Sequence, residues 1–179
     1  MKGARRWERC AALAGGAAVL AGLVAGCGGA GAQDGARDAP RSPGRQMPPY
    51  WLDDAAPPAV ARQLHVTVPA TATEVKAAHQ KGFQDDGLLL AFVLPSSEVD
   101  GFVARLAPER PLRTRQEPVA GAVKPATPFA HLGLPEPESL PGVREGQVCA
   151  PCRGDLNFLQ VAVARAGEGT ARVYLRGSD

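Results

Sequence analysis

Two neighbouring cysteines, Cys149 and Cys152, have the clearest chemical potential in this chain. They stand as Cys149-Ala-Pro-Cys152, a spacing that allows a structural disulfide across a tight loop, where the short loop limits the gain in stability. The same two thiolates and a pair from His65, His79 and His131 would supply the four ligands that zinc prefers. Because the three histidines are scattered singly, we expect a disulfide and no metal site.

The pair also resembles the C-x-x-C motif of thioredoxin-like oxidoreductases, which implies thiol–disulfide exchange as an alternative. In that family the motif lies at a helix N-terminus, where the pKa of a thiol is lowered. Here neither an apolar strand nor a tryptophan leads into Cys149, and the residues from Leu156 onward have a strand pattern. The feature that separates the two interpretations is whether Cys149 caps a helix.

Other catalytic signatures do not occur in the sequence. It has no nucleophile elbow, Walker loop, dinucleotide fingerprint or His-Glu-x-x-His motif. Two carboxylate pairs, Asp85-Asp86 and Glu136-x-Glu138, are interpreted as part of a turn and of a solvated loop. We therefore assign no catalytic residue and no cofactor, and a non-enzymatic role is favoured over an enzymatic one.

The first residues of the chain have the three parts of a secretory signal. Lys2 and three arginines are followed by an uncharged run of Ala, Gly, Leu and Val over residues 11–25. This run is shorter than the roughly 20 apolar residues of a transmembrane helix and matches the length of a signal core. Small residues then lead directly into Cys27, in the order Leu23-Val24-Ala25-Gly26-Cys27.

This stretch resembles the lipobox of bacterial lipoproteins. The resemblance implies that Leu23 or Val24 is the apolar recognition position of the signal peptidase, with Ala25 and Gly26 as the small positions. It also implies that Cys27 carries a thioether-linked diacylglycerol and becomes the new N-terminus. Two acyl chains give stable anchoring, so we expect the outer face of the cell membrane as the location and the membrane as a partner.

Charge and composition exclude one class of partner. Residues 1–26 hold four basic residues and one acidic residue, so the mature chain keeps 16 basic against 17 acidic residues. Nucleic-acid binding needs clustered Lys and Arg, and neither the balance nor the spacing supplies such a cluster. The abundance of Ala, Gly, Pro and Arg resembles that of uncharacterised actinobacterial lipoproteins.

After Cys27, Gly, Ala, Pro, Arg, Asp and Ser dominate as far as Pro49, and this stretch cannot bury enough apolar surface to become ordered. We predict a disordered tether over residues 27–58, in which Tyr50-Trp51-Leu52 docks the incoming chain onto the domain. A flexible chain of about 22 residues has a reach on the order of 25 Å.

Apolar periodicity predicts strands at residues 64–68, 73–83, 88–94, 156–165 and 171–176. For residues 73–83 a helix is the alternative, which alternation along the segment disfavours. The turn signal Asp85-Asp86-Gly87 and the sequence Gly167-Glu168-Gly169 predict two β-hairpins. Residues 88–94 are apolar on both faces, so this strand is expected to be central and covered on both sides.

One amphipathic helix is expected directly after that strand. Ser96 or Ser97 is the predicted N-cap, and the apolar stripe is formed by Val99, Phe102, Val103 and Leu106, before Pro108 ends the helix.

Residues 108–151 are rich in proline and lack a long periodic run. This excursion is either mobile or the cover for the second face of the sheet, in which case Phe129, Leu132, Leu134 and Leu140 would pack against it. His131 is expected to be an exposed bystander.

Together these patterns predict one α+β domain over residues 59–179, after a signal peptide at residues 1–26. We expect an antiparallel sheet of about four to five strands, in two hairpins, with one packed helix. The expected function is a lipid-anchored, non-enzymatic binding or scaffolding module for a protein or small-molecule ligand. A membrane-tethered thiol–disulfide redox protein is the alternative.

Overall fold

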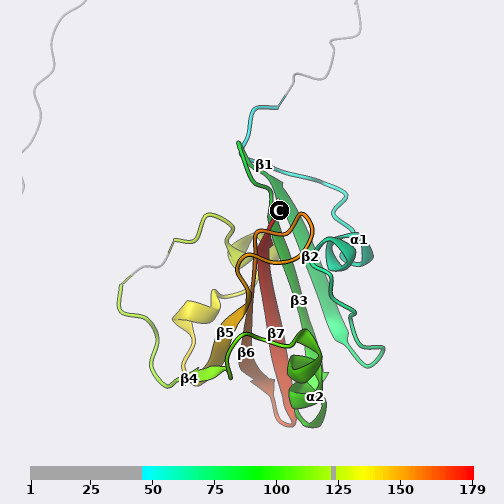
Figure 1. The fold of residues 1–179 in the computed structure, drawn as a ribbon. Helices are drawn as coiled ribbons and strands as arrows, with labels where there is room; N and C mark the ends of the chain where they lie inside the picture. Colours follow the sequence, from blue (N-terminus) through cyan, green and yellow to red (C-terminus); the bar gives the residue numbers. More distant parts are fainter. Residues whose placement is uncertain (1–45, 122–123) are drawn as a thin grey trace, which may run out of the picture. The chain divides into compact units, whose positions relative to one another are not determined.

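The computed structural model describes residues 46–121 and 124–179. In this part of the chain, one sheet has seven strands in the order β1-β2-β3-β7-β6-β5-β4, and every neighbouring pair is antiparallel (Figure 1). The strands are β1 (Tyr50–Trp51), β2 (Thr73–Lys81), β3 (Gly87–Pro95), β4 (Arg113–Arg115), β5 (Val143–Cys149), β6 (Phe158–Gly167) and β7 (Thr170–Ser178). The predicted α+β class with an antiparallel sheet is confirmed, whereas the predicted four to five strands were too few.

The hairpin of β2 and β3 is confirmed, and residues 73–81 form a strand, not a helix. The register places Ala78 opposite Leu89 and Gln80 opposite Gly87, so the chain turns at residues 82–86 as the Asp-Asp-Gly signal predicted. β3 is central and its residues 87–94 are all buried. Its side chains divide between two apolar clusters, because Leu88 and Leu90 point to one face and Leu89 to the other.

The second hairpin, β6 to β7, is also confirmed, and its register pairs Val161 with Leu175 and Val163 with Val173. All four side chains lie in the same apolar cluster, as the alternation predicted. Gly169 in the turn has a φ of +65°, a conformation that glycine adopts without steric cost. β7 also pairs along its length with β3, so the two hairpins join through the last strand of the chain.

The predicted amphipathic helix is α2 (Ser96–Leu106). Its stripe buries Val99, Phe102 and Val103, and the Phe102 ring meets the Phe92 ring edge-on at 5.3 Å between centroids. The predicted serine N-cap was wrong: Pro95 occupies that position and no side chain caps the helix.

A second helix, α1 (Pro57–Gln63), which the sequence did not predict, begins in the last residues of the predicted tether and ends just before the predicted edge strand. Pro57 and Pro58 occupy its first positions, where proline needs no hydrogen-bond partner for its nitrogen. The predicted strand at residues 64–68 is wrong, since Leu64 is the C-cap of α1 and no strand follows before β2. The domain therefore begins earlier than residue 59, because β1 and α1 are already part of it.

The apolar–polar alternation at residues 64–68, which predicted a strand, is explained by a turn of the backbone. His65 has a φ of +56°, which turns the chain directly after α1. Val66 N then donates a hydrogen bond to the carbonyl of Ala61. Leu64 and Val66 are consequently buried on either side of an exposed His65, although residues 64–68 do not pair with any strand of the sheet.

Both helices cover one face of the sheet, and the proline-rich excursion covers the other. α1 contacts β2 and β3, and α2 contacts β3 and β7 (Figure 1). On the opposite face, Phe129 and Leu134 are buried, with Leu132 and Leu140 partly buried beside them. Of the two interpretations of residues 108–151, the structure supports the cover.

The excursion also contributes two strands and two 3-10 helices that the sequence did not predict. These are β4, β5, η1 (Phe129–Leu132) and η2 (Pro137–Ser139). Arg115 of β4 fixes the excursion in place, because its guanidinium donates hydrogen bonds to Glu145 and to the carbonyls of Pro137 and Leu140.

Candidate ligand-binding groove

An open groove of about 860 Å³ lies on the face of the sheet that carries the two helices. Three segments line it: residues 64–67 after α1, residues 102–109 at the end of α2, and residues 148–159 around the connection of β5 and β6. These segments are far apart in the sequence. The fold brings them together because α1 lies over β2 and β3 and α2 over β3 and β7, next to β6 and β5.

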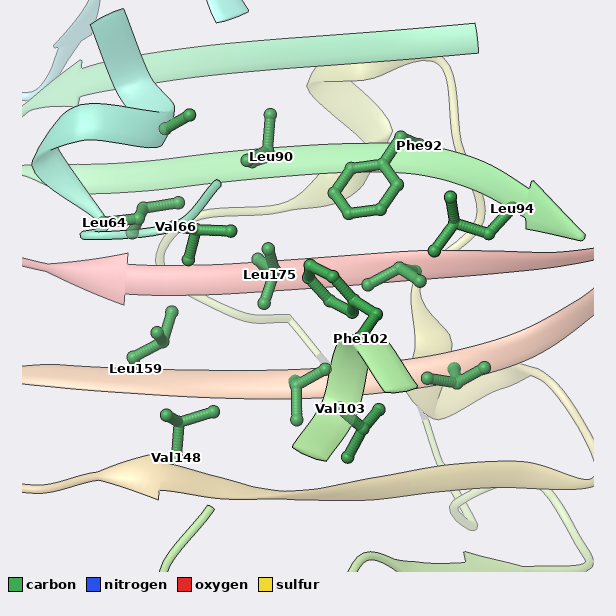
Figure 2. Close-up of a cluster of buried hydrophobic side chains, with 14 of the residues drawn as sticks. Leu64, Val66, Leu90, Phe92, Leu94, Phe102, Val103, Val148, Leu159 and Leu175 are labelled. Atoms are coloured by element: carbon green, nitrogen blue, oxygen red, sulfur yellow. The ribbon is translucent and has the colours of Figure 1, made fainter. Parts of the chain in front are cut away.

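The floor of the groove is apolar and continuous with the main core. Figure 2 shows Val148 of β5 and Leu159 of β6 on the same face as Leu64 and Val66, with Phe102 reaching in from α2. The lining includes Leu64, Val66, Phe102, Leu106, Val148, Leu156 and Leu159. All of these except Leu106 are buried, so the rigid core itself forms the floor.

One wall is the loop closed by a disulfide between Cys149 and Cys152. The Ala150 N–H donates a hydrogen bond to Glu109 Oε1 at 2.9 Å, which joins this loop to the segment after α2. Gln147 Nε2 donates to the carbonyls of Cys149 and Leu159 at 2.6 and 3.0 Å. The loop is therefore held from both sides.

The structure joins Cys149 and Cys152 in a disulfide and shows whether Cys149 caps a helix, which was the feature that separates the two interpretations of this pair. Cys149 is the last residue of β5, and residues 150–157, all of them described, contain no helix. Cys149 accordingly does not stand at a helix N-terminus, which was the setting that the resemblance to thioredoxin-like oxidoreductases implied.

The rim of the groove carries more positive than negative side chains. Two guanidinium groups, of Arg105 and Arg153, line it together with one carboxylate, of Glu109, and with the His65 ring. The Arg105 guanidinium lies over the Phe102 ring, 5.9 Å from its centroid. Arg105 and Arg153 are exposed, and neither forms an ion pair with any residue of the described ranges.

The three histidines considered as zinc ligands lie in three different environments. His79 is buried, and its Nε2 lies 2.7 Å from Asp86 Oδ2. His131 is exposed, as expected, but it stacks on Trp51 with 3.8 Å between ring centroids. His65 lies at the groove. Among residues 46–121 and 124–179, no three His, Cys, Asp or Glu side chains gather as a metal site would require.

The first carboxylate pair belongs to the hairpin turn, as predicted. Asp86 accepts hydrogen bonds from Lys81, from His79 and from the Gly82 N–H. Burial raises the pKa of Asp86, but the hydrogen bonds outweigh burial and leave that pKa below its ordinary value. Asp179 exchanges two backbone hydrogen bonds with Asp86, and its pKa is raised by burial and by the Asp86 charge. The arrangement braces the turn against the end of the chain.

The second carboxylate pair is not a solvated loop, which corrects the prediction. Glu136 and Glu138 each form an ion pair with Arg176 at 2.8 Å, and the Arg176 side chain is only 12% exposed. Its guanidinium also lies over the Phe129 ring, 5.0 Å from the centroid. Burial raises the pKa of Glu138, yet the hydrogen bond from Arg176 and the positive charges of Arg176 and Arg115 together outweigh burial and leave this pKa below its ordinary value. This cluster fastens the proline-rich cover to β7.

A smaller cavity of about 310 Å³ adjoins this cluster, and it differs from the groove in chemistry. Its polar lining includes Gln147, Gln160 and Tyr174, beside Glu138 and Arg176. Because Arg176 is already paired with two carboxylates, this cavity offers less free charge than the rim of the groove.

Sequence reasoning missed most of the groove. It identified Cys149 and Cys152 and weighed His65 only as a zinc ligand, and it assigned no binding role to Arg105, Glu109 or Arg153. No local motif marks these residues as a set, because they become neighbours only through the sheet order.

The lipobox residues Leu23, Val24, Ala25, Gly26 and Cys27 lie outside the described residues. Within residues 46–121 and 124–179, none of the helices has the length and apolar character needed to cross a bilayer. Comparison of the chain with models of protein families, with curated proteins and with solved structures found no match.

Proposed function

We propose that this protein is a lipid-anchored binding module at the outer face of a bacterial cell membrane. The anchor is the diacylglycerol expected on Cys27, and the ligand-binding site is the groove between α1, α2 and the disulfide loop. The observation that carries the binding role is the groove itself, in which an apolar floor meets an exposed charged rim. Ligand pockets in proteins have this composition and a volume of roughly 300–1,000 Å³.

The anchoring is supported by the sequence Leu23-Val24-Ala25-Gly26-Cys27. Each buried methylene contributes about 0.8 kcal/mol of membrane affinity, so two acyl chains hold a protein stably where one does not. The predicted tether after Cys27 gives the domain freedom to meet its ligand above the lipid headgroups.

The anchoring is tested by metabolic labelling with palmitate in a bacterial host. We expect the full chain to be labelled and to sediment with membranes, and Cys27→Ser to lose both properties. Cys10→Ser is the matched control, because Cys10 is removed with the signal peptide and its loss should leave labelling intact. Label that survives Cys27→Ser would contradict the anchoring.

The binding role is tested with Nile red, a neutral dye that fluoresces in apolar surroundings. We expect the full chain with Cys27→Ser to bind the dye, and Thr67→Trp to reduce this binding because Thr67 is exposed at the groove. Thr114→Trp is the matched control on exposed β4. Equal dye binding by both tryptophan variants would contradict the assignment of the groove.

A second candidate is thiol–disulfide exchange, favoured by the position of the Cys149–Cys152 bridge at a groove instead of inside the core. This function requires the reduced pair to contain a thiol that titrates well below its ordinary pKa of about 8.5. We would measure that pKa from the rate of alkylation as a function of pH. A bridge that stays inert in mild reductant would eliminate this candidate.

A further inference from the structure

We propose that the ligand of the groove is a long-chain carboxylate, a fatty acid whose acyl chain lies on the apolar floor and whose carboxylate lies at the arginine rim. This inference rests on the binding role proposed above and specifies its ligand. Three observations carry it: the apolar floor, the excess of positive charge among the exposed side chains that line the groove, and the disulfide wall.

The floor suits a flexible hydrocarbon. Leucine and valine side chains supply most of it, and no charged side chain comes from the strands below. A chain lying there removes its methylenes from water, each worth about 0.8 kcal/mol when fully buried. The groove is open to solvent and is not an enclosed cavity, so a long chain can enter it without an opening of the core.

The rim selects for an anion. Arg105 and Arg153 are exposed and have no ion-pair partner within the described ranges, and His65 adds a further hydrogen-bonding side chain. The single opposing carboxylate, Glu109, already accepts the hydrogen bond from the Ala150 N–H through Oε1. Two guanidinium groups without ion-pair partners in the described ranges, against one carboxylate, leave an excess of positive charge that favours a carboxylate head group over a cationic or a neutral one.

The wall keeps the groove formed without its ligand. The Cys149–Cys152 bridge, the Ala150–Glu109 hydrogen bond and the Gln147 hydrogen bonds all restrain the same loop. Binding to a preformed site avoids the cost of ordering a loop. Reduction of the bridge should therefore weaken binding even where the domain stays folded.

The test uses the full chain with Cys27→Ser, which cannot take the lipid, and all variants are made in this background so that residues 1–26 are the same in each. The probe is cis-parinaric acid, a fluorescent polyene fatty acid, and its methyl ester is the neutral comparison. We expect saturable binding of one acid per chain, about tenfold tighter than binding of the ester, since hydrogen bonds to a charged group favour the acid by this order. Butyrate, which has the carboxylate without the long chain, should not displace the probe.

Two variants assign the binding to the groove. Arg105→Gln with Arg153→Gln should weaken the acid about tenfold and leave the ester unchanged. Thr67→Trp should weaken both ligands, because a large side chain at this exposed lining position would obstruct the groove. Arg165→Gln, which removes an exposed arginine elsewhere on the sheet, is the matched control and should bind like the parent chain. Circular dichroism checks that every variant is folded.

Each outcome decides the proposal. A folded chain that does not bind the acid, an ester that binds as tightly as the acid, or a double arginine variant that binds like its parent would overturn it. These results are separable from the function proposed above, because palmitate labelling reports the anchor and Nile red reports the groove. If the chain binds Nile red but not the fatty acid, the fatty-acid proposal is wrong and the proposed binding function still holds.

Discussion

Replacing Arg176 by glutamine should destabilise the protein far more than replacing an arginine in an exposed ion pair. Arg176 is paired with Glu136 and Glu138, and the three side chains are only 12%, 15% and 24% exposed. Removal of one partner from a buried ion pair leaves uncompensated charge and typically costs about 3–5 kcal/mol. Because the guanidinium also packs on the Phe129 ring, we expect a loss near the upper end of this range.

The matched control is Arg144→Gln. Arg144 pairs with Asp100 at 2.7 Å, but the two side chains are 42% and 79% exposed. Such surface pairs contribute at most about 1 kcal/mol. Urea unfolding followed by circular dichroism would compare the free energies of unfolding. Equal losses for Arg176→Gln and Arg144→Gln would refute the reasoning that burial, not the ion pair alone, determines the cost.

The same cluster gives a pH dependence of definite sign. The folded-state pKa of Glu138 lies below its ordinary value of 4.5, so this carboxylate binds its proton more weakly in the folded chain than in the unfolded one. Its contribution to stability is present above the unfolded pKa and is lost as the pH falls through the folded pKa. We expect acidification below about pH 4.5 to destabilise the parent chain, and Arg176→Gln to flatten this dependence. If the free energy of unfolding of Arg176→Gln fell with acidification as steeply as that of the parent chain, Arg176 would not be the cause of the lowered pKa of Glu138.

Three further predictions test the packing. Gly177→Ala should cost about 1–3 kcal/mol, because an added Cβ would overlap Leu64 Cδ2 and lie 3.2 Å from the Phe158 carbonyl oxygen. Gly101→Ala, at an exposed position of α2, should instead gain about 0.5–1 kcal/mol, and equal melting temperatures of the two variants would contradict both expectations. Phe102→Ala should cost about 3–5 kcal/mol in urea unfolding, since this side chain is 1% exposed and packs on Phe92; a loss below about 1 kcal/mol would show that α2 does not anchor the core. The double change of Cys149 and Cys152 to serine should cost only about 1–2 kcal/mol, because the bridge closes a short loop; unfolding of the chain at room temperature would contradict this.

The parts of the fold that sequence predicted are those with local signals. The hairpin of β2 and β3 follows from alternation on either side of Asp85-Asp86-Gly87, and α2 follows from an apolar stripe of helical period. In both cases, neighbours along the chain determine which face is buried. Tertiary contacts then reinforce a preference that the segment already has.

The parts that sequence missed depend on distant contacts. β5 reads Val-Arg-Glu-Gly-Gln-Val-Cys, which is too polar to indicate a strand, and it is extended because β6 and β4 pair with it. α1 is only seven residues long, which is too short for a clear helical period. After it, the turn at His65 buries the residues on both sides of an exposed one, and this burial pattern gives the sequence an alternation typical of a strand. The ion pairs of Glu136 and Glu138 could not be predicted either, because their partner, Arg176, is far away in the sequence, on β7.

In the candidate site, too, sequence predicted the feature with a local signal and missed the feature that depends on distant contacts. The Cys149–Cys152 pair was visible as a motif, because its chemistry depends on residues three positions apart. The rim was not visible, because Arg105 and Arg153 come from a helix end and a loop that only the tertiary fold joins.

The place of β7 in the sheet constrains how the chain can acquire its structure. This last strand lies between β3 and β6, and without it the two halves of the sheet share no hydrogen-bonded edge. A growing polypeptide therefore carries two incomplete half-sheets, each with an apolar edge strand open to aggregation, until β7 is available. Termination before Thr170 would leave both halves unpaired, so removal of the central β7 should be more damaging than removal of β1, which lies at the edge of the sheet.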